Sequence, residues 1–181
     1  MSILKTLFGM TDSTAHAASN AGDTGGGDTE TVRRIVGELE ALDADTARYL
    51  AAFAYVLGRV AHADLEISAE ETAKMEEIVH GFGHLPEEQA ILVVQIAKSQ
   101  NRLFGGTENF LVTREFKEIA SREQRETLLD CLFAVSAADD SISVAEEEEV
   151  RGIASELGFT HKEYVDSRAR YSEYREVMKG L

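Results

Sequence analysis

Apolar residues recur every three or four positions along most of this chain, which is the spacing of an amphipathic helix. The pattern holds from Thr29 to near the end of the chain, and no segment shows the period of two that is typical of a half-buried strand. The spacing therefore predicts an all-α fold, a helical bundle of seven to eight helices.

Helix boundaries follow from capping residues and glycines at the ends of the apolar stripes. Three segments, Ser68–Glu71, Ser143–Glu146 and Thr160–Glu163, have the Ser/Thr-x-x-Glu spacing of a capping box. Asp45 is the expected N-cap of the second helix, and Pro86 is the expected first residue of the fourth. We expect helices at about 29–42, 46–63, 69–83, 86–100, 108–119, 122–138, 144–157 and 161–179.

The first 28 residues differ in composition from the rest of the chain. Residues 11–28 are rich in Gly, Ser and Ala and hold almost no large apolar side chain, so burial cannot offset their ordering entropy. We expect a flexible linker there, joining the short apolar segment 1–10 to a helical domain at 29–181. The segment 1–10 is expected to fold back on its own domain, with docking on a partner or on a membrane surface as the alternatives.

The chain repeats itself at an offset of 75 residues. The sequence D-x-x-I-S-x-x-E begins at Asp64 and again at Asp139. Apolar positions of the preceding helices also correspond, which predicts two helix-turn-helix hairpins at about 46–83 and 121–158. Each hairpin has one apolar face, and pairing the hairpins buries both faces. We expect one shared core that contains Leu57, Val60, Leu132 and Val135.

Charge narrows the class of partner. The formal net charge of −15 disfavours nucleic acid and anionic lipid, and it favours cations and basic proteins. No apolar run is long enough for a transmembrane helix, and the N-terminus lacks the pattern of a signal peptide. We therefore expect a cytoplasmic protein. The single cysteine, Cys131, lies on an apolar helix face and predicts a buried thiol, with a reactive thiol as the alternative.

Helix capping accounts for part of the repeated motif. A capping box explains Ser68 with Glu71 and Ser143 with Glu146, at about 0.5–2 kcal/mol for each cap. It does not explain the aspartates, because a carboxylate at the C-terminal end of a helix is unfavourable by about 0.3–1 kcal/mol. Three things could offset that cost: water and salt, a basic partner, or a bound cation such as calcium or magnesium.

Other patterns of metal or catalytic chemistry are weaker. With Asp139 as position 1, an EF-hand loop would need glycine at Val144 and glutamate at Val150, so the EF-hand is excluded. Glu77 and His80 match half of a di-iron motif that needs a second copy, and His80 with His84 could pair on zinc only at a helix end that holds two glycines. We expect no enzyme.

The doubled D-x-x-I-S-x-x-E motif, closing one helix and opening the next in an all-α chain, resembles the tellurite-resistance protein B (TerB-like) family over residues 45–175. The resemblance implies an internally duplicated helical fold, metal ligands at Asp64, Glu71, Asp139 and Glu146, and a role in bacterial stress beside membrane-linked assemblies. The family usually has Asp-Gly at these turns, where this chain has Asp64-Leu65 and Asp139-Asp140. Asp140 tolerates the left-handed backbone that glycine suits, and Leu65 does so poorly.

Together these patterns and the resemblance predict a non-enzymatic TerB-like module that binds a divalent cation, with calcium or magnesium favoured over zinc. It would act as a scaffold or sensor with a protein partner, in the cytoplasm or at the periphery of a membrane complex. A purely structural partner-binding domain and a metal-dependent enzyme are the alternatives.

Overall fold

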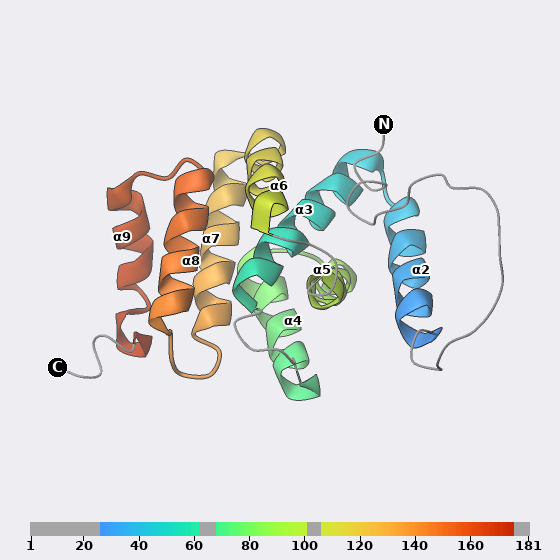
Figure 1. The fold of residues 1–181 in the computed structure, drawn as a ribbon, viewed down its shortest axis with the longest axis horizontal. Coiled ribbons are helices and arrows are strands. Elements are labelled where there is room, and N and C mark those ends of the chain that lie inside the picture. Colours follow the sequence, from blue (N-terminus) through green and yellow to red (C-terminus); the bar gives the residue numbers. More distant parts are fainter. Residues whose placement is uncertain (1–25, 62–67, 101–105, 176–181) are drawn as a thin grey trace.

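The structure is a computed structural model that describes residues 26–61, 68–100 and 106–175 (Figure 1). Those residues form eight α-helices, one short 3-10 helix and a single isolated bridge, with no strand among them. The all-α prediction is confirmed. The helices are α2 (Gly26–Glu40), α3 (Ala44–Ala61), α4 (Ala69–Gly83), α5 (Glu87–Gln100), α6 (Gly106–Ile119), α7 (Arg122–Ser136), α8 (Val144–Glu156) and α9 (His161–Ala169), followed by η1 (Ser172–Tyr174).

Helix α3 organises the bundle, because it packs against α5, α6 and α7. Helices α7, α8 and α9 contact one another in a row, and α2 and α9 lie at opposite ends of the molecule (Figure 1). α4 joins the two halves by packing on both α5 and α7. The four residues predicted to share a core, Leu57, Val60, Leu132 and Val135, all belong to the same hydrophobic cluster.

Four N-terminal boundaries differ from the sequence prediction, and the simplest difference is that α6 begins at Gly106 instead of about 108. α2 begins at Gly26, so the last residues of the predicted linker are helical; glycine permits helical dihedral angles, and Ile35 and Leu39 anchor the helix downstream. Asp43, not Asp45, caps α3, since its Oδ1 accepts from the Thr46 N–H at 2.9 Å. The Pro86 carbonyl accepts from the Ala90 N–H at 2.9 Å, which makes Pro86 the N-cap of α5. The first residue of α5 is therefore Glu87, one residue later than predicted.

The last helix is shorter than predicted. α9 ends at Ala169, and residues 170–175 turn back toward α7 and α8 instead of continuing as a helix to 179. The reason is tertiary: Tyr171 stacks on Phe133, and the Ile142 N–H donates to the Tyr174 carbonyl at 2.7 Å. The predicted segment 1–10 and linker residues 11–25 lie outside the described residues.

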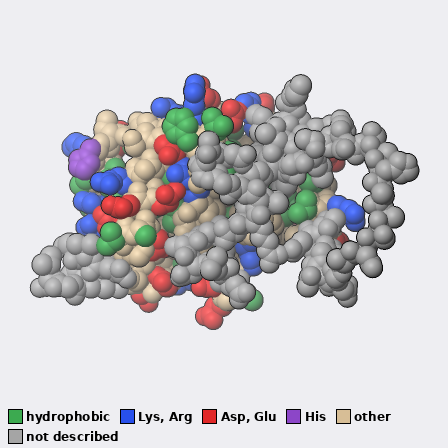
Figure 2. All heavy atoms as spheres, viewed as in Figure 1, with side chains coloured by type: hydrophobic (Ala, Val, Ile, Leu, Met, Phe, Trp, Pro, Cys, Tyr) green, Lys and Arg blue, Asp and Glu red, His purple; other side chains and the backbone are tan. Residues whose placement is uncertain are grey.

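The described part of the surface carries many charged side chains of both signs (Figure 2). Figure 2 shows acidic and basic side chains interspersed over the described part of the visible face. In the described ranges, no helix combines the length and the apolar character that crossing a bilayer requires.

Candidate functional site

The α7–α8 turn carries the second copy of the acidic motif. α7 ends at the C-cap Ala137, whose N–H donates to the Phe133 carbonyl. Asp139 Oδ1 then accepts from the Ser141 N–H at 3.1 Å, a side-chain contact that closes the turn on itself. Asp140 adopts φ 64°, the left-handed conformation that glycine suits and that aspartate was expected to tolerate.

Both predicted capping boxes of the repeat are present. The Glu71 and Glu146 N–H groups each donate to the hydroxyl of the serine three residues earlier at 3.2 Å. In return, one carboxylate oxygen of Glu71 accepts from the Ser68 N–H at 2.6 Å, and one of Glu146 accepts from the Ser143 N–H at 2.9 Å. The hydrogen bonds with Ser68, first of all the one from its backbone N–H, lower the pKa of the Glu71 carboxyl. Two of the four predicted ligands therefore hold helix ends.

Arginines offset much of the negative charge in the run 146–149. Glu147 receives Arg168 at 2.9 Å and Arg175 at 2.7 and 2.8 Å. Burial opposes the charged form of Glu147, but its hydrogen bonds and attraction to the two arginines prevail and lower its pKa. Glu149 pairs with Arg59 at 2.8 Å. Basic groups of the same chain thus neutralise Glu147 and Glu149 at the start of α8, whereas the contact of Asp139 is with the Ser141 N–H.

Arg59 is a site residue that sequence reasoning missed. It lies near the end of α3 with a side chain only 8% exposed, and it bonds to Glu149 at 2.8 Å and Glu156 at 2.6 Å on α8. It also donates to Thr113 Oγ1 on α6 at 2.6 Å. Its partners are 54 to 97 residues away in the chain, so no local spacing could reveal them.

The structure places the four predicted ligands unevenly. Asp139 and Glu146 belong to the same turn, Glu71 lies in the first turn of α4, and Asp64 lies outside the described residues. Within the described ranges, no group of three or more His, Cys, Asp or Glu side chains is arranged to hold a metal ion. Two carboxylates with retained waters is nevertheless a donor set that magnesium uses in proteins.

The other candidate groups hold structural positions. His80 Nδ1 lies 2.7 Å from the Leu85 carbonyl oxygen, and His84 is the C-cap of α4 with φ 52°. Cys131 is buried as predicted, and burial raises the pKa of its thiol to about 12.

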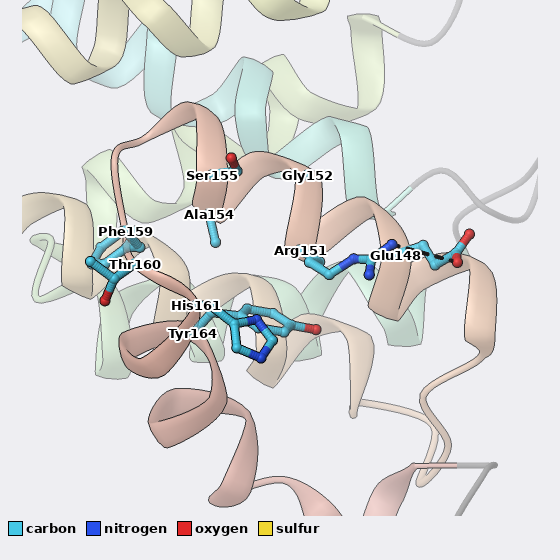
Figure 3. Close-up of a pocket in the computed structure, with 9 residues that line it drawn as sticks. All are labelled: Glu148, Arg151, Gly152, Ala154, Ser155, Phe159, Thr160, His161 and Tyr164. Atoms are coloured by element: carbon cyan, nitrogen blue, oxygen red, sulfur yellow. Dashed lines mark ion pairs between the residues drawn. The ribbon is translucent and has the colours of Figure 1, made fainter.

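An open groove of about 350 Å³ lies between α8 and α9 (Figure 3). Gly152 and Ser155 line it from α8, and His161 and Tyr164 line it from α9. Arg151 reaches along α8 toward Glu148, 3.7 Å away, and both side chains are largely exposed. A second hollow of about 460 Å³ lies among the start of α3, the end of α6 and the start of α7. Both are surface grooves with mixed polar and apolar linings.

Comparison with known proteins identifies the domain. The family model described as "Tellurite resistance protein TerB" matches residues 49–169, which run from α3 to the end of α9. No curated protein and no solved structure matches the chain significantly. Since the matched segment covers more than half of the sequence and contains both acidic turns, this chain belongs to the TerB family.

Proposed function

We propose that this protein is a non-enzymatic scaffold module that binds a divalent cation, calcium or magnesium, at its acidic interhelical turns and a protein partner on its surface. The observation that carries the proposal is the doubled turn chemistry. The same Ser-Glu capping box recurs 75 residues apart, and at the α7–α8 turn it stands beside Asp139, whose carboxylate the capping box does not use.

The turn is suited to a cation as a rigid source of oxygen ligands. The left-handed Asp140, the Asp139–Ser141 contact and the Ser143–Glu146 cap fix the backbone from the end of α7 to the start of α8. A fixed backbone lowers the entropy lost when carboxylates are ordered around an ion. Waters would complete the coordination, as they commonly do for magnesium. In this proposal the cation would stabilise the turn rather than catalyse a reaction.

A cation-free partner-binding domain is the second candidate. It is favoured by the use of Glu71 and Glu146 as helix caps and of Glu147 and Glu149 as arginine partners, because those contacts serve the fold without a metal. In either case the stress response of the family would be the setting in the cell, and docking of the apolar segment 1–10, the alternative to its folding back on the domain, would bring the module to a membrane-linked assembly.

Thermal melts separate the two candidates. We expect wild type to gain about 2.7 kcal/mol at a hundredfold excess of calcium or magnesium over Kd, and Asp139→Asn to gain far less. In chelator, Asp139→Asn should change stability little, within about 1 kcal/mol, because it removes a charge from a helix end but weakens the contact with Ser141.

Ser143→Ala is the matched control for capping. It should cost about 1 kcal/mol with and without metal, because the cap bonds the backbone and not the ion. A wild-type melt that no divalent ion shifts would remove the cation from the proposal and leave the partner-binding domain.

A further inference from the structure

Residues 170–175, which we call the C-terminal strap, follow α9 (Figure 1). They contact α7 through Tyr171 and the start of α8 through Arg175. Tyr171 stacks on Phe133 with ring centroids 5.4 Å apart and planes at 14°. The Ile142 N–H donates to the Tyr174 carbonyl at 2.7 Å, and Ile142 forms an isolated parallel bridge with Arg175. The strap is thus turn and 3-10 helix up to Tyr174, and it pairs with the α7–α8 turn through its backbone only at its end.

Each end of the strap places an arginine on a carboxylate. Arg170 bonds to Asp130 of α7 through two guanidinium nitrogens, one of them at 3.0 Å. Arg175 bonds to Glu147 of α8 through Nε at 2.7 Å and a terminal nitrogen at 2.8 Å. Such two-point arginine–carboxylate pairs fix orientation as well as charge.

The surface beneath the strap has the chemistry of a small protein interface. Its centre is Phe133 and Ile142, which are buried when the strap is in place, and its rim is Asp130 and Glu147. An apolar centre with a charged rim that receives tyrosine and arginine is typical of binding hot spots. We call these four residues the strap face.

The strap is held less firmly than the helices. Tyr171 and Tyr174 are only half-buried, Ser172 and Glu173 are exposed, and the backbone contact is an isolated bridge. Segments with few buried apolar contacts open at low free-energy cost. The family match ends at residue 169, so the residues of the strap face lie within the matched segment and the strap follows it.

We propose that the strap face is a docking site for a short segment of a partner protein that adopts the turn-like path of the strap and carries arginine on both sides of tyrosine or a similar aromatic residue. The strap is its resident occupant and keeps the site closed until a partner's segment displaces it. The acidic rim, in a chain of net charge −15, selects a basic segment. This inference names the partner's chemistry and does not depend on the cation.

A fluorescent peptide with the sequence of residues 168–175 tests the proposal on the full chain. The strap of wild type competes at an effective concentration on the order of millimolar. The variant Tyr171→Ala/Arg175→Ala should therefore bind the peptide at least tenfold more tightly than wild type does. Adding Glu147→Gln should reverse that gain, and a peptide with alanine at the positions of Tyr171 and Arg175 should show no gain.

Equal peptide affinity for wild type and the strap variant, or a gain that survives Glu147→Gln, would overturn the proposal. A strap variant that instead forms a dimer with wild type in light scattering would also overturn it, because the occupant would then be a second copy. If the strap variant does not fold, wild type carries the test. Millimolar peptide should then displace the strap and shift the amide resonances of Ser172 to Arg175 in the isotope-labelled protein, and unmoved resonances would reject the site.

Discussion

At the residue scale, backbone conformation explains two positions that side-chain chemistry does not. Asp140 adopts φ 64° in the α7–α8 turn, and Gly158 adopts φ 84° after α8. Only glycine enters this region without steric cost, and aspartate is among the residues that tolerate it. Asp140 therefore keeps the backbone of an Asp-Gly turn while adding a charge to it.

Two glycines six residues apart should respond oppositely to alanine. Gly158→Ala should destabilise the fold by about 1–2 kcal/mol, because alanine disfavours positive φ and its Cβ would lie 3.0 Å from the Lys117 side chain. Gly152→Ala is the matched control within α8, where a Cβ meets nothing within 4 Å, and it should stabilise by about 0.5–1 kcal/mol. Urea unfolding measures both, and changes of the same sign would contradict the assignment.

At the element scale, helix starts that carry a local capping signal were predictable from sequence. Segments whose path is set by contacts with distant parts of the chain were not. The capping boxes at Ser68, Ser143 and Thr160 form as their spacing predicts, because every partner lies within three residues. The C-terminal strap carries a helix-like pattern, yet it leaves the helical path for contacts with Phe133 and Ile142. Of the predicted metal ligands, sequence placed Glu71 and Glu146 at helix starts. It could not show that arginines pair with the neighbouring Glu147 and Glu149.

The pH dependence of strap docking follows from Glu147. Its pKa is lowered from the ordinary value of 4.5, so its ionised form stabilises the fold above that value and the contribution is lost as the pH falls through the lowered pKa. Wild type should therefore lose stability below about pH 4.5, and Glu147→Gln should lose less over the same range. Glu148→Gln is the control, since Glu148 has only an exposed contact of 3.7 Å with Arg151. Urea unfolding at a series of pH values measures the free energy of unfolding of all three proteins. An equal loss of that free energy at acidic pH in all three would contradict this role.

At the scale of the whole molecule, the two hairpins are equivalent in their apolar faces and different in their polar contacts. Leu57 and Leu132 occupy corresponding positions and share one core. Arg59, by contrast, corresponds to Ala134 in the second hairpin. The ion pairs from Arg59 on α3 to Glu149 and Glu156 on α8, which we call the Arg59 clasp, therefore have no counterpart there. The shared core follows from the repeat, because apolar periodicity is visible in sequence. The clasp follows only from the way in which α3, α6 and α8 meet.

Breaking the Arg59 clasp should therefore weaken the contact between the hairpins. Arg59→Met keeps the apolar stem but leaves Glu149, Glu156 and Thr113 without their shared donor. We expect a cost of about 2–3 kcal/mol in urea unfolding, below the full cost of a deeply buried pair because Glu149 is 38% exposed. Arg151→Met is the control and should change stability by less than about 0.5 kcal/mol, since that arginine is 62% exposed. In a double-mutant cycle, Arg59→Met and Glu156→Gln should couple by about 1 kcal/mol or more, and additive effects would mean that the clasp does not join the hairpins.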